Sequence, residues 1–390
     1  MLVTCINKMI KKDNVYTIPL PGNELVLTKN LYNKEYVEVN LLECLLNKDS
    51  KKTIWWFNEL YSSGFKHRCT KLVLFIYYYF FAALNPGFEA YMLKKLKEEQ
   101  ESCLSGLLLN LLERPFSVDV FLFYHLSKVV EMESNLLDGD VDPEEVAQLR
   151  YWLIMNDKLS ICNLPLRSKD ASIFRVTNLY NMFIKEVDVD NCDKLSKSWR
   201  LVVNHPIIKQ FDIDLRLITL ARIVGFYTSA DERGKNVYKK FPDTATATFE
   251  ETSFEPYLNF RINSKHNIGN CKMLDLFNFK SNKSNKVEVY NQYWLYHAAF
   301  SPIWTDRIKA CRGYVDYKTK EVGFVDSDLE SEFYEQFWID FDEQPACVKE
   351  KFMYKKGTWR WIDFYEQYKT NSIFDFVEEE LCELKMNSLC

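Results

Sequence analysis

The chain has 390 residues, of which 47% are hydrophobic, 15% aromatic and 27% charged, and its formal net charge is −5 with a pI near 5.8. This composition excludes a disordered chain. The acidic balance also argues against a dedicated nucleic-acid binder, because such proteins usually carry a basic domain or stripe.

The first forty residues predict short extended segments at 15–18, 24–28 and 36–39, with a Pro-Gly turn between the first two. A helical region is expected to begin near residue 40. Its central feature is the uncharged run 72–84, Leu-Val-Leu-Phe-Ile-Tyr-Tyr-Tyr-Phe-Phe-Ala-Ala-Leu. That run is shorter than the roughly 20 apolar residues that cross a bilayer. Because it is also too apolar for a surface helix, we expect it to be buried by neighbouring helices.

Apolar spacing and helix-stop signals predict a series of consecutive helices with short connections. They are expected at 41–46, 50–63, 88–101, 103–113, 116–136, 143–155 and 171–186. Such a series favours a helical bundle or a stack of helical pairs.

From about residue 200 the pattern changes. The segment 226–286 is polar and is expected to be an insertion or linker. Helices are then predicted at 290–300, from 301, and at 328–341, 345–355, 358–369 and 373–386, with a hairpin at 314–317 and 321–325. The expected fold is mainly α with a small β component (α+β overall). The expected domains are 1–40 (β-rich), 41–225 (helical), 226–286 (linker) and 287–390 (mixed α/β).

No motif in the sequence carries recognisable chemistry. The five histidines have no metal-ligand spacing. The spacing of Asp138, Asp140 and Asp142 resembles a calcium loop, but Pro143 and Leu149 stand where that loop needs glycine and glutamate. We therefore interpret Pro143 as the first residue of a helix. No phosphate-binding or nucleophile motif occurs, so we expect no cofactor and no enzymatic activity; a site assembled only in three dimensions is the alternative.

Two segments are candidate binding surfaces. Aromatic residues of the acidic stretch 323–348 recur every four residues, which indicates either a core-facing helix stripe or a docking surface for a basic protein. The candidate protein-interaction residues are Phe333, Phe337, Trp338, Asp340, Phe341 and Asp342. The basic and aromatic segment 354–361 is either a junction between two helices or a contact with nucleic acid. Its candidate residues are Lys355, Lys356, Trp359, Arg360 and Trp361.

Several segments together resemble uncharacterised proteins of the large nucleocytoplasmic (giant) DNA viruses. They are 54–64 (Ile-Trp-Trp-Phe-Asn-Glu-Leu-Tyr-Ser-Ser-Gly), 77–89, and 293–308 with 332–336 and 342–345. The resemblance implies a viral protein of the host cytoplasm, but it carries no catalytic residue onto this chain. A cytoplasmic location also agrees with the eleven scattered cysteines, which form no Cys-x-x-Cys pair, and with the absence of an apolar secretory segment near the N-terminus.

The sequence therefore predicts a non-enzymatic viral scaffold or adaptor that binds viral or host proteins through helix faces, without contact with a membrane. Two non-enzymatic alternatives stay open. One is a minor structural, capsid- or virion-associated protein. The other is a helical-repeat adaptor of RNA or the translation machinery, loosely similar to the helical middle domain of translation initiation factor 4G.

Overall fold

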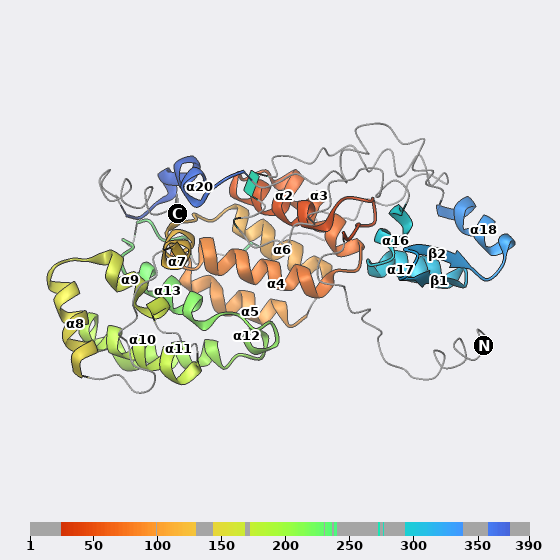
Figure 1. Cartoon of the computed structure of the whole chain (residues 1–390). Helices are drawn as coiled ribbons and strands as arrows, with labels where there is room; N and C mark the ends of the chain where they lie inside the picture. The colour runs from red at the N-terminus through yellow and green to blue at the C-terminus, as the bar shows by residue number, and fades with distance from the viewer. Residues whose placement is uncertain are drawn as a thin grey trace.

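A computed structural model describes residues 25–98, 100–129, 143–167, 172–229, 231–235, 238–239, 272–273, 276, 293–337 and 358–374. The described chain is mainly helical and has one small antiparallel hairpin, which confirms the predicted fold class (Figure 1). The α-helices are α2 (Lys34–Leu46), α3 (Ser50–Ser62), α4 (Lys66–Ile76), α5 (Glu89–Leu96), α6 (Glu101–Leu112), α7 (Asp119–Val129), α8 (Pro143–Ile154), α9 (Lys158–Arg167), α10 (Ile173–Val187), α11 (Cys192–Val203), α12 (Pro206–Gln210), α13 (Leu215–Phe226), α16 (Trp294–Ala298), α17 (Pro302–Ala310), α18 (Ser327–Phe337) and α20 (Trp361–Tyr368). Shorter turns are η1 (Tyr77–Phe81), η2 (Pro86–Phe88), η3 (Val189–Asn191) and η6 (Lys369–Asn371), and the strands are β1 (Gly313–Asp316) and β2 (Glu321–Phe324).

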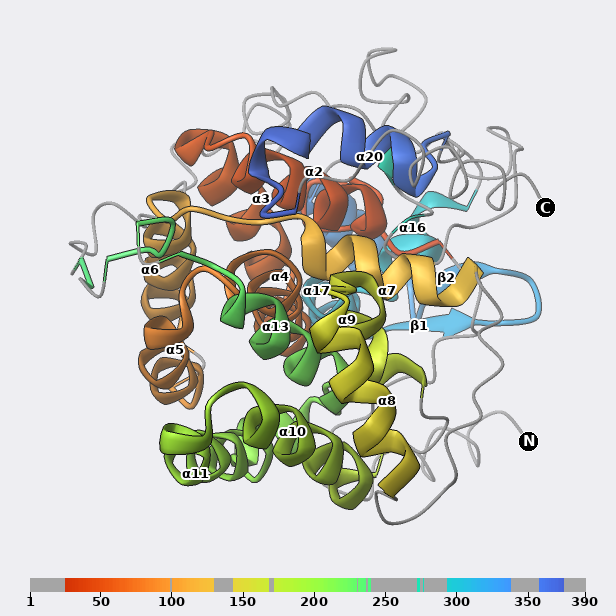
Figure 2. The same ribbon diagram turned by 90° about the vertical axis from the view of Figure 1, so that its left-hand side faces the viewer.

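The apolar run 72–84 lies at the centre of the large helical core, as predicted. Every residue of the run except Phe75 is buried. Figure 2 shows α4 nearly end-on, surrounded by the other helices of this core. The five aromatic residues of η1 continue α4 as a π-helix, in which the Ala82 N–H donates to the Tyr77 carbonyl, five residues back, at 2.8 Å. The sequence predicted the burial of this run but not its wider turn.

The segment 36–39 is helical, so the predicted strand there is wrong. The Asn33 side chain caps α2 by accepting from the Glu35 N–H at 2.9 Å. Tyr36, Val37 and Val39 are then buried in the large core, where α2 packs against α3. Burial of these side chains outweighs the weak strand preference of the β-branched residues.

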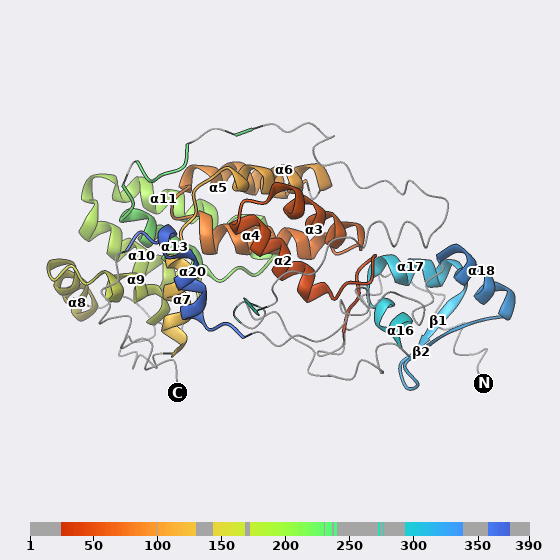
Figure 3. The same cartoon turned by 90° about the horizontal axis from the view of Figure 1, so that it is seen from above.

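A smaller unit occupies one end of the molecule (Figures 1 and 3). It combines α16, α17, the β1–β2 hairpin and α18 with residues 25–31 around the buried side chain of Trp304. The strands pair antiparallel from Gly313 opposite Phe324 to Asp316 opposite Glu321, which confirms the predicted hairpin. We call this unit the small module.

The described residues of the expected C-terminal domain 287–390 belong to different cores. Those at 293–337 build the small module, whereas α20 packs on the large core, with the Phe364 ring 4.6 Å from that of Phe121. Described parts of the expected linker 226–286 also contact the helical core: Tyr238 stacks on Tyr91 at 4.4 Å, and Met273 is buried. The domain bounds themselves stay a prediction.

Candidate functional site

The described part of the predicted protein-interaction stripe belongs to the core of the small module. Phe333 is 1% exposed and packs on Phe324 at 5.0 Å. Phe337 is half-buried, and the Arg307 guanidinium lies 4.7 Å from its ring. Of the two alternatives for this stripe, the structure therefore gives the core-facing one at these two positions. Trp338, Asp340, Phe341 and Asp342 lie outside the described residues.

The predicted nucleic-acid cluster does not form one exposed stacking surface in its described part. Trp361 is buried in the large core, so its indole cannot stack on a base. Trp359 is half-buried, with the Lys272 ammonium 5.9 Å from its ring, and Arg360 is exposed and pairs with Asp363 at 3.5 Å. Lys355 and Lys356 lie outside the described residues.

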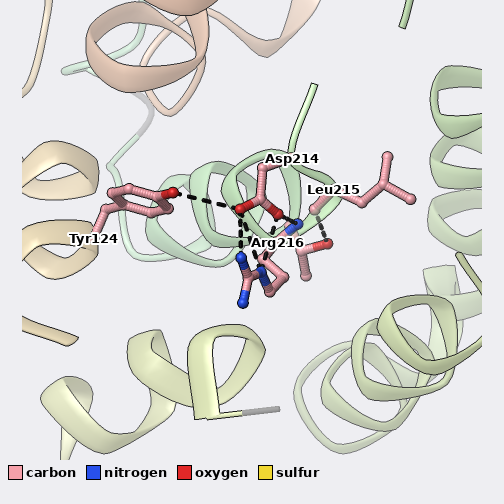
Figure 4. A network of polar contacts seen from close by, with 5 residues as sticks. Tyr124, Asp214, Leu215 and Arg216 are labelled. Carbon is pink, nitrogen blue, oxygen red and sulfur yellow. Dashed lines mark hydrogen bonds and ion pairs between the residues drawn. The ribbon is translucent and has the colours of Figure 1, made fainter. Parts of the chain in front are cut away.

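A polar network joins α7 to the start of α13 (Figure 4). Asp214 caps α13 by accepting from the Arg216 N–H at 2.9 Å, and it also accepts from the Arg216 Nη2 at 2.8 Å and from the Tyr124 hydroxyl at 3.5 Å. Burial raises the pKa of Tyr124 and of Tyr79 beside it, so both phenols stay protonated. Asp214 pairs with Arg216, so this network provides a helix cap and a link between two helices.

A second network is more deeply buried. The Glu89 carboxylate accepts from the Tyr78 hydroxyl at 3.1 Å and from the Arg222 Nη2 at 2.6 Å, and Arg222 also donates to Ser198 Oγ at 3.3 Å. Burial disfavours the charge on Arg222, but the attraction of Glu89 outweighs it and the pKa is raised. The two opposite charges thus satisfy each other between α5 and α13.

Burial suppresses the reactivity of three of the described cysteines. Burial raises the pKa of the Cys44 thiol to about 12 and those of Cys69 and Cys162 well above the ordinary value, so these thiols are unreactive. Within the described ranges, no group of three His, Cys, Asp or Glu side chains could hold a metal ion. None of the described helices is long and apolar enough to span a membrane.

The most unusual surface feature is an exposed apolar face on α8. Tyr151, Ile154 and Met155 are 57%, 82% and 59% exposed, and the spacing of three and four residues places them on one side of the helix with the exposed Ala147. The opposite side buries Trp152, among others. We call Ala147, Tyr151, Ile154 and Met155 the α8 face. Figures 1 and 3 show that α8 lies at the end of the molecule remote from the small module.

No family model, curated protein or solved structure matches this chain. The α8 face is therefore argued from its own residues.

The sequence carries a signal for this face, although the face itself was not predicted. The helix 143–155 was predicted, and it begins at Pro143 as expected. It carries large apolar residues on two opposite sides, Leu149 and Trp152 on one and Tyr151 and Ile154 on the other. A helix that is apolar on both sides either is surrounded by its own chain or has a second partner.

Proposed function

We propose that this protein is a non-enzymatic helical adaptor that binds another protein through the α8 face. The exposure of three large apolar side chains at helical spacing is the observation that carries this proposal. Exposed apolar patches are typical of sites that bind other proteins. Side chains spaced by three and four residues form ridges and grooves, into which a second helix can pack.

α8 is held firmly against α10, so the face is presented on a fixed support. The Arg175 guanidinium donates to the Glu145 carboxylate in a buried, two-pronged ion pair. Arg150 donates to the Glu186 carboxylate at 2.8 and 3.0 Å on the exposed side. A preorganised face loses less conformational entropy on binding than a mobile one.

The size and charge of the face define its partner. A stable complex buries about 800 Å² on each side from 20–30 residues, and the four residues of the α8 face are fewer than that. They suit the apolar seam of one amphipathic helix bound transiently. Glu144, exposed at the start of α8 and without a described ion pair, favours a Lys or Arg at the matching end of that seam.

The test compares Ile154→Asp with a matched control, Val325→Asp, which places the same charge on a 64% exposed apolar residue of the other end of the molecule. Tagged full-length wild type and variants are isolated from cells that express the gene. The proteins that each of them retains are quantified by mass spectrometry. Each protein retained by wild type is then purified, and its dissociation constant is measured by calorimetry.

Burial of an isoleucine side chain contributes about 1.5–3 kcal/mol. We therefore expect Ile154→Asp to weaken the affinity for the partner about 10- to 100-fold and Val325→Asp to leave that affinity unchanged. Equal affinity of wild type and Ile154→Asp for every captured protein would refute the proposal. Sedimentation showing that Ile154→Asp only dissociates a homodimer would also refute the proposal, because the α8 face would then serve self-association.

A further inference from the structure

A basic surface is formed by three helices that are separated in the sequence. Its residues are Lys94 and Lys97 at the end of α5, Lys194, Lys197 and Arg200 on α11, and Lys209 on α12, and all six are exposed. We call this set the basic surface. Figures 2 and 3 show α5 beside α11.

Two observations relate the elements of this surface at its α12 end. His205, between α11 and α12, lies close enough to Lys97 that, in addition to burial, the lysine charge lowers its pKa. The His67 ring at the start of α4 stacks on Phe211, just after α12, at 4.3 Å between centroids. The exposed imidazole of His67 therefore lies at the edge of the basic surface.

The cations of the basic surface form no ion pairs within the described chain, although the exposed carboxylate of Glu98 lies near Lys94. None of its six cations makes an ion pair with another described residue, whereas the neighbouring Lys95 pairs with Glu98 at 3.0 Å. The exposed carboxylates on α11 and just after α12 are Asp193 and Asp212. Because the whole chain has a net charge of −5, its average hides this local excess of cations.

We propose that the basic surface binds the sugar-phosphate backbone of a nucleic acid without reading its sequence. Lys194, Lys197 and Arg200 follow one another every three residues, which is a rise of about 4.5 Å per step along the helix. α5, with Lys94 and Lys97 at its end, lies beside α11 (Figures 2 and 3). Two rows of cations on an open surface fit a polymer of regularly spaced phosphates.

An anionic membrane is the less favoured polyanion. Interfacial helices insert a row of apolar side chains between their basic residues. Among the described residues of α5, α11 and α12, Leu201 is the one large apolar side chain that is exposed, at 67%. The exposed ring of His67 lies at the edge of the basic surface and can stack on an unpaired base.

The test measures binding of the full-length protein to short labelled single-stranded RNA, double-stranded RNA and double-stranded DNA by fluorescence anisotropy between about 50 and 200 mM salt. The variant Lys197→Glu/Arg200→Glu is compared with Lys309→Glu/Lys318→Glu, which makes the same change of net charge at exposed sites of the small module. The three probes distinguish which nucleic acid supplies the phosphates.

We expect wild type to bind at least one probe with an affinity that falls steeply with salt. Loss of two phosphate contacts reduces the slope of log K against log salt by roughly 1.4–1.8. The Lys197→Glu/Arg200→Glu variant should bind at least tenfold more weakly than wild type, and the control within twofold of it, at about 50 mM salt.

Three results would overturn the inference: no binding of any probe, equal weakening in both double variants, or binding of phosphatidylserine vesicles that the probes do not displace. Ile154→Asp should bind nucleic acid as wild type does, so this test succeeds or fails independently of the adaptor proposal.

Discussion

Protonation of His297 should loosen the small module in acid. His297 is 2% exposed, with Tyr296 on one side and the backbone of residues 25–27 on the other. Burial lowers the pKa of His297 to about 4. A hydrogen bond with the Leu25 backbone acts to raise this pKa, and the charge of Lys320 acts to lower it further. In the unfolded chain the pKa of a histidine is about 6.5. The unfolded state therefore binds more protons between these two values, and stability is lost as the pH falls from about 6.5 toward 4.

The size of this loss follows from the two pKa values. One pKa unit corresponds to about 1.36 kcal/mol. With a folded pKa of about 4 and an unfolded pKa of about 6.5, the His297 contribution at pH 4.5 is less favourable than at pH 7 by about 2 kcal/mol. Carboxylates also titrate in this range, so the pH dependence of wild type alone does not isolate His297.

The assay is urea unfolding followed by tryptophan fluorescence, because Trp294 and Trp304 lie in the same module. The free energy of unfolding is measured near pH 7 and near pH 4.5 for wild type and His297→Asn. We expect the pH-dependent loss to be smaller by roughly 2 kcal/mol in His297→Asn than in wild type. Identical pH dependence in wild type and His297→Asn would refute the reasoning.

Two further predictions concern stability and are measured by the same unfolding assay. Gly106 lies inside α6 with no atom within 4 Å of an added Cβ, so Gly106→Ala should stabilise the protein by about 0.5–1 kcal/mol. At Gly64, φ is +92° and an added Cβ would lie 2.5 Å from the Pro302 Cβ, so Gly64→Ala should destabilise the protein. Glu145→Gln removes the negative charge that faces the fully buried Arg175 and should lower the free energy of unfolding by about 3–5 kcal/mol. Glu145→Met/Arg175→Met should recover most of that stability. Equal losses in the single and double variants would show that the pair does not act through its charge.

The features that the sequence predicted correctly are marked by residues that lie near one another in the chain. The burial of residues 72–84 followed from thirteen uncharged residues in a row, and the hairpin of the small module followed from two short apolar segments around Lys318-Thr-Lys320. The start of α8 at Pro143 followed from a proline directly after an acidic turn. In each case neighbouring residues carry the signal, although distant helices supply the burial of residues 72–84.

The features that the sequence did not predict depend on partners far away in the chain. Tyr36 and Val37 are helical because α3 covers them, and Phe364 is buried because Phe80 and Phe121 lie above it. The ion pair between Glu89 and Arg222 joins residues 133 positions apart, and no sequence motif indicates it. Periodicity shows that a stripe of side chains shares one side of a helix, but only the fold shows whether that side is inside.

The α8 face and the basic surface belong to one continuous support, which makes their roles separable by experiment. α10 packs against both α8 and α11, and the buried Trp199 of α11 donates to Thr177 Oγ1 of α10 at 3.0 Å. A substitution that damages this support should weaken protein and nucleic-acid binding together. A substitution confined to an exposed side chain should weaken only one of them, because Ile154 and Arg200 point away from the core that they share. An adaptor built in this way can hold a protein and a nucleic acid on the same rigid body, where each raises the effective concentration of the other without any change in shape.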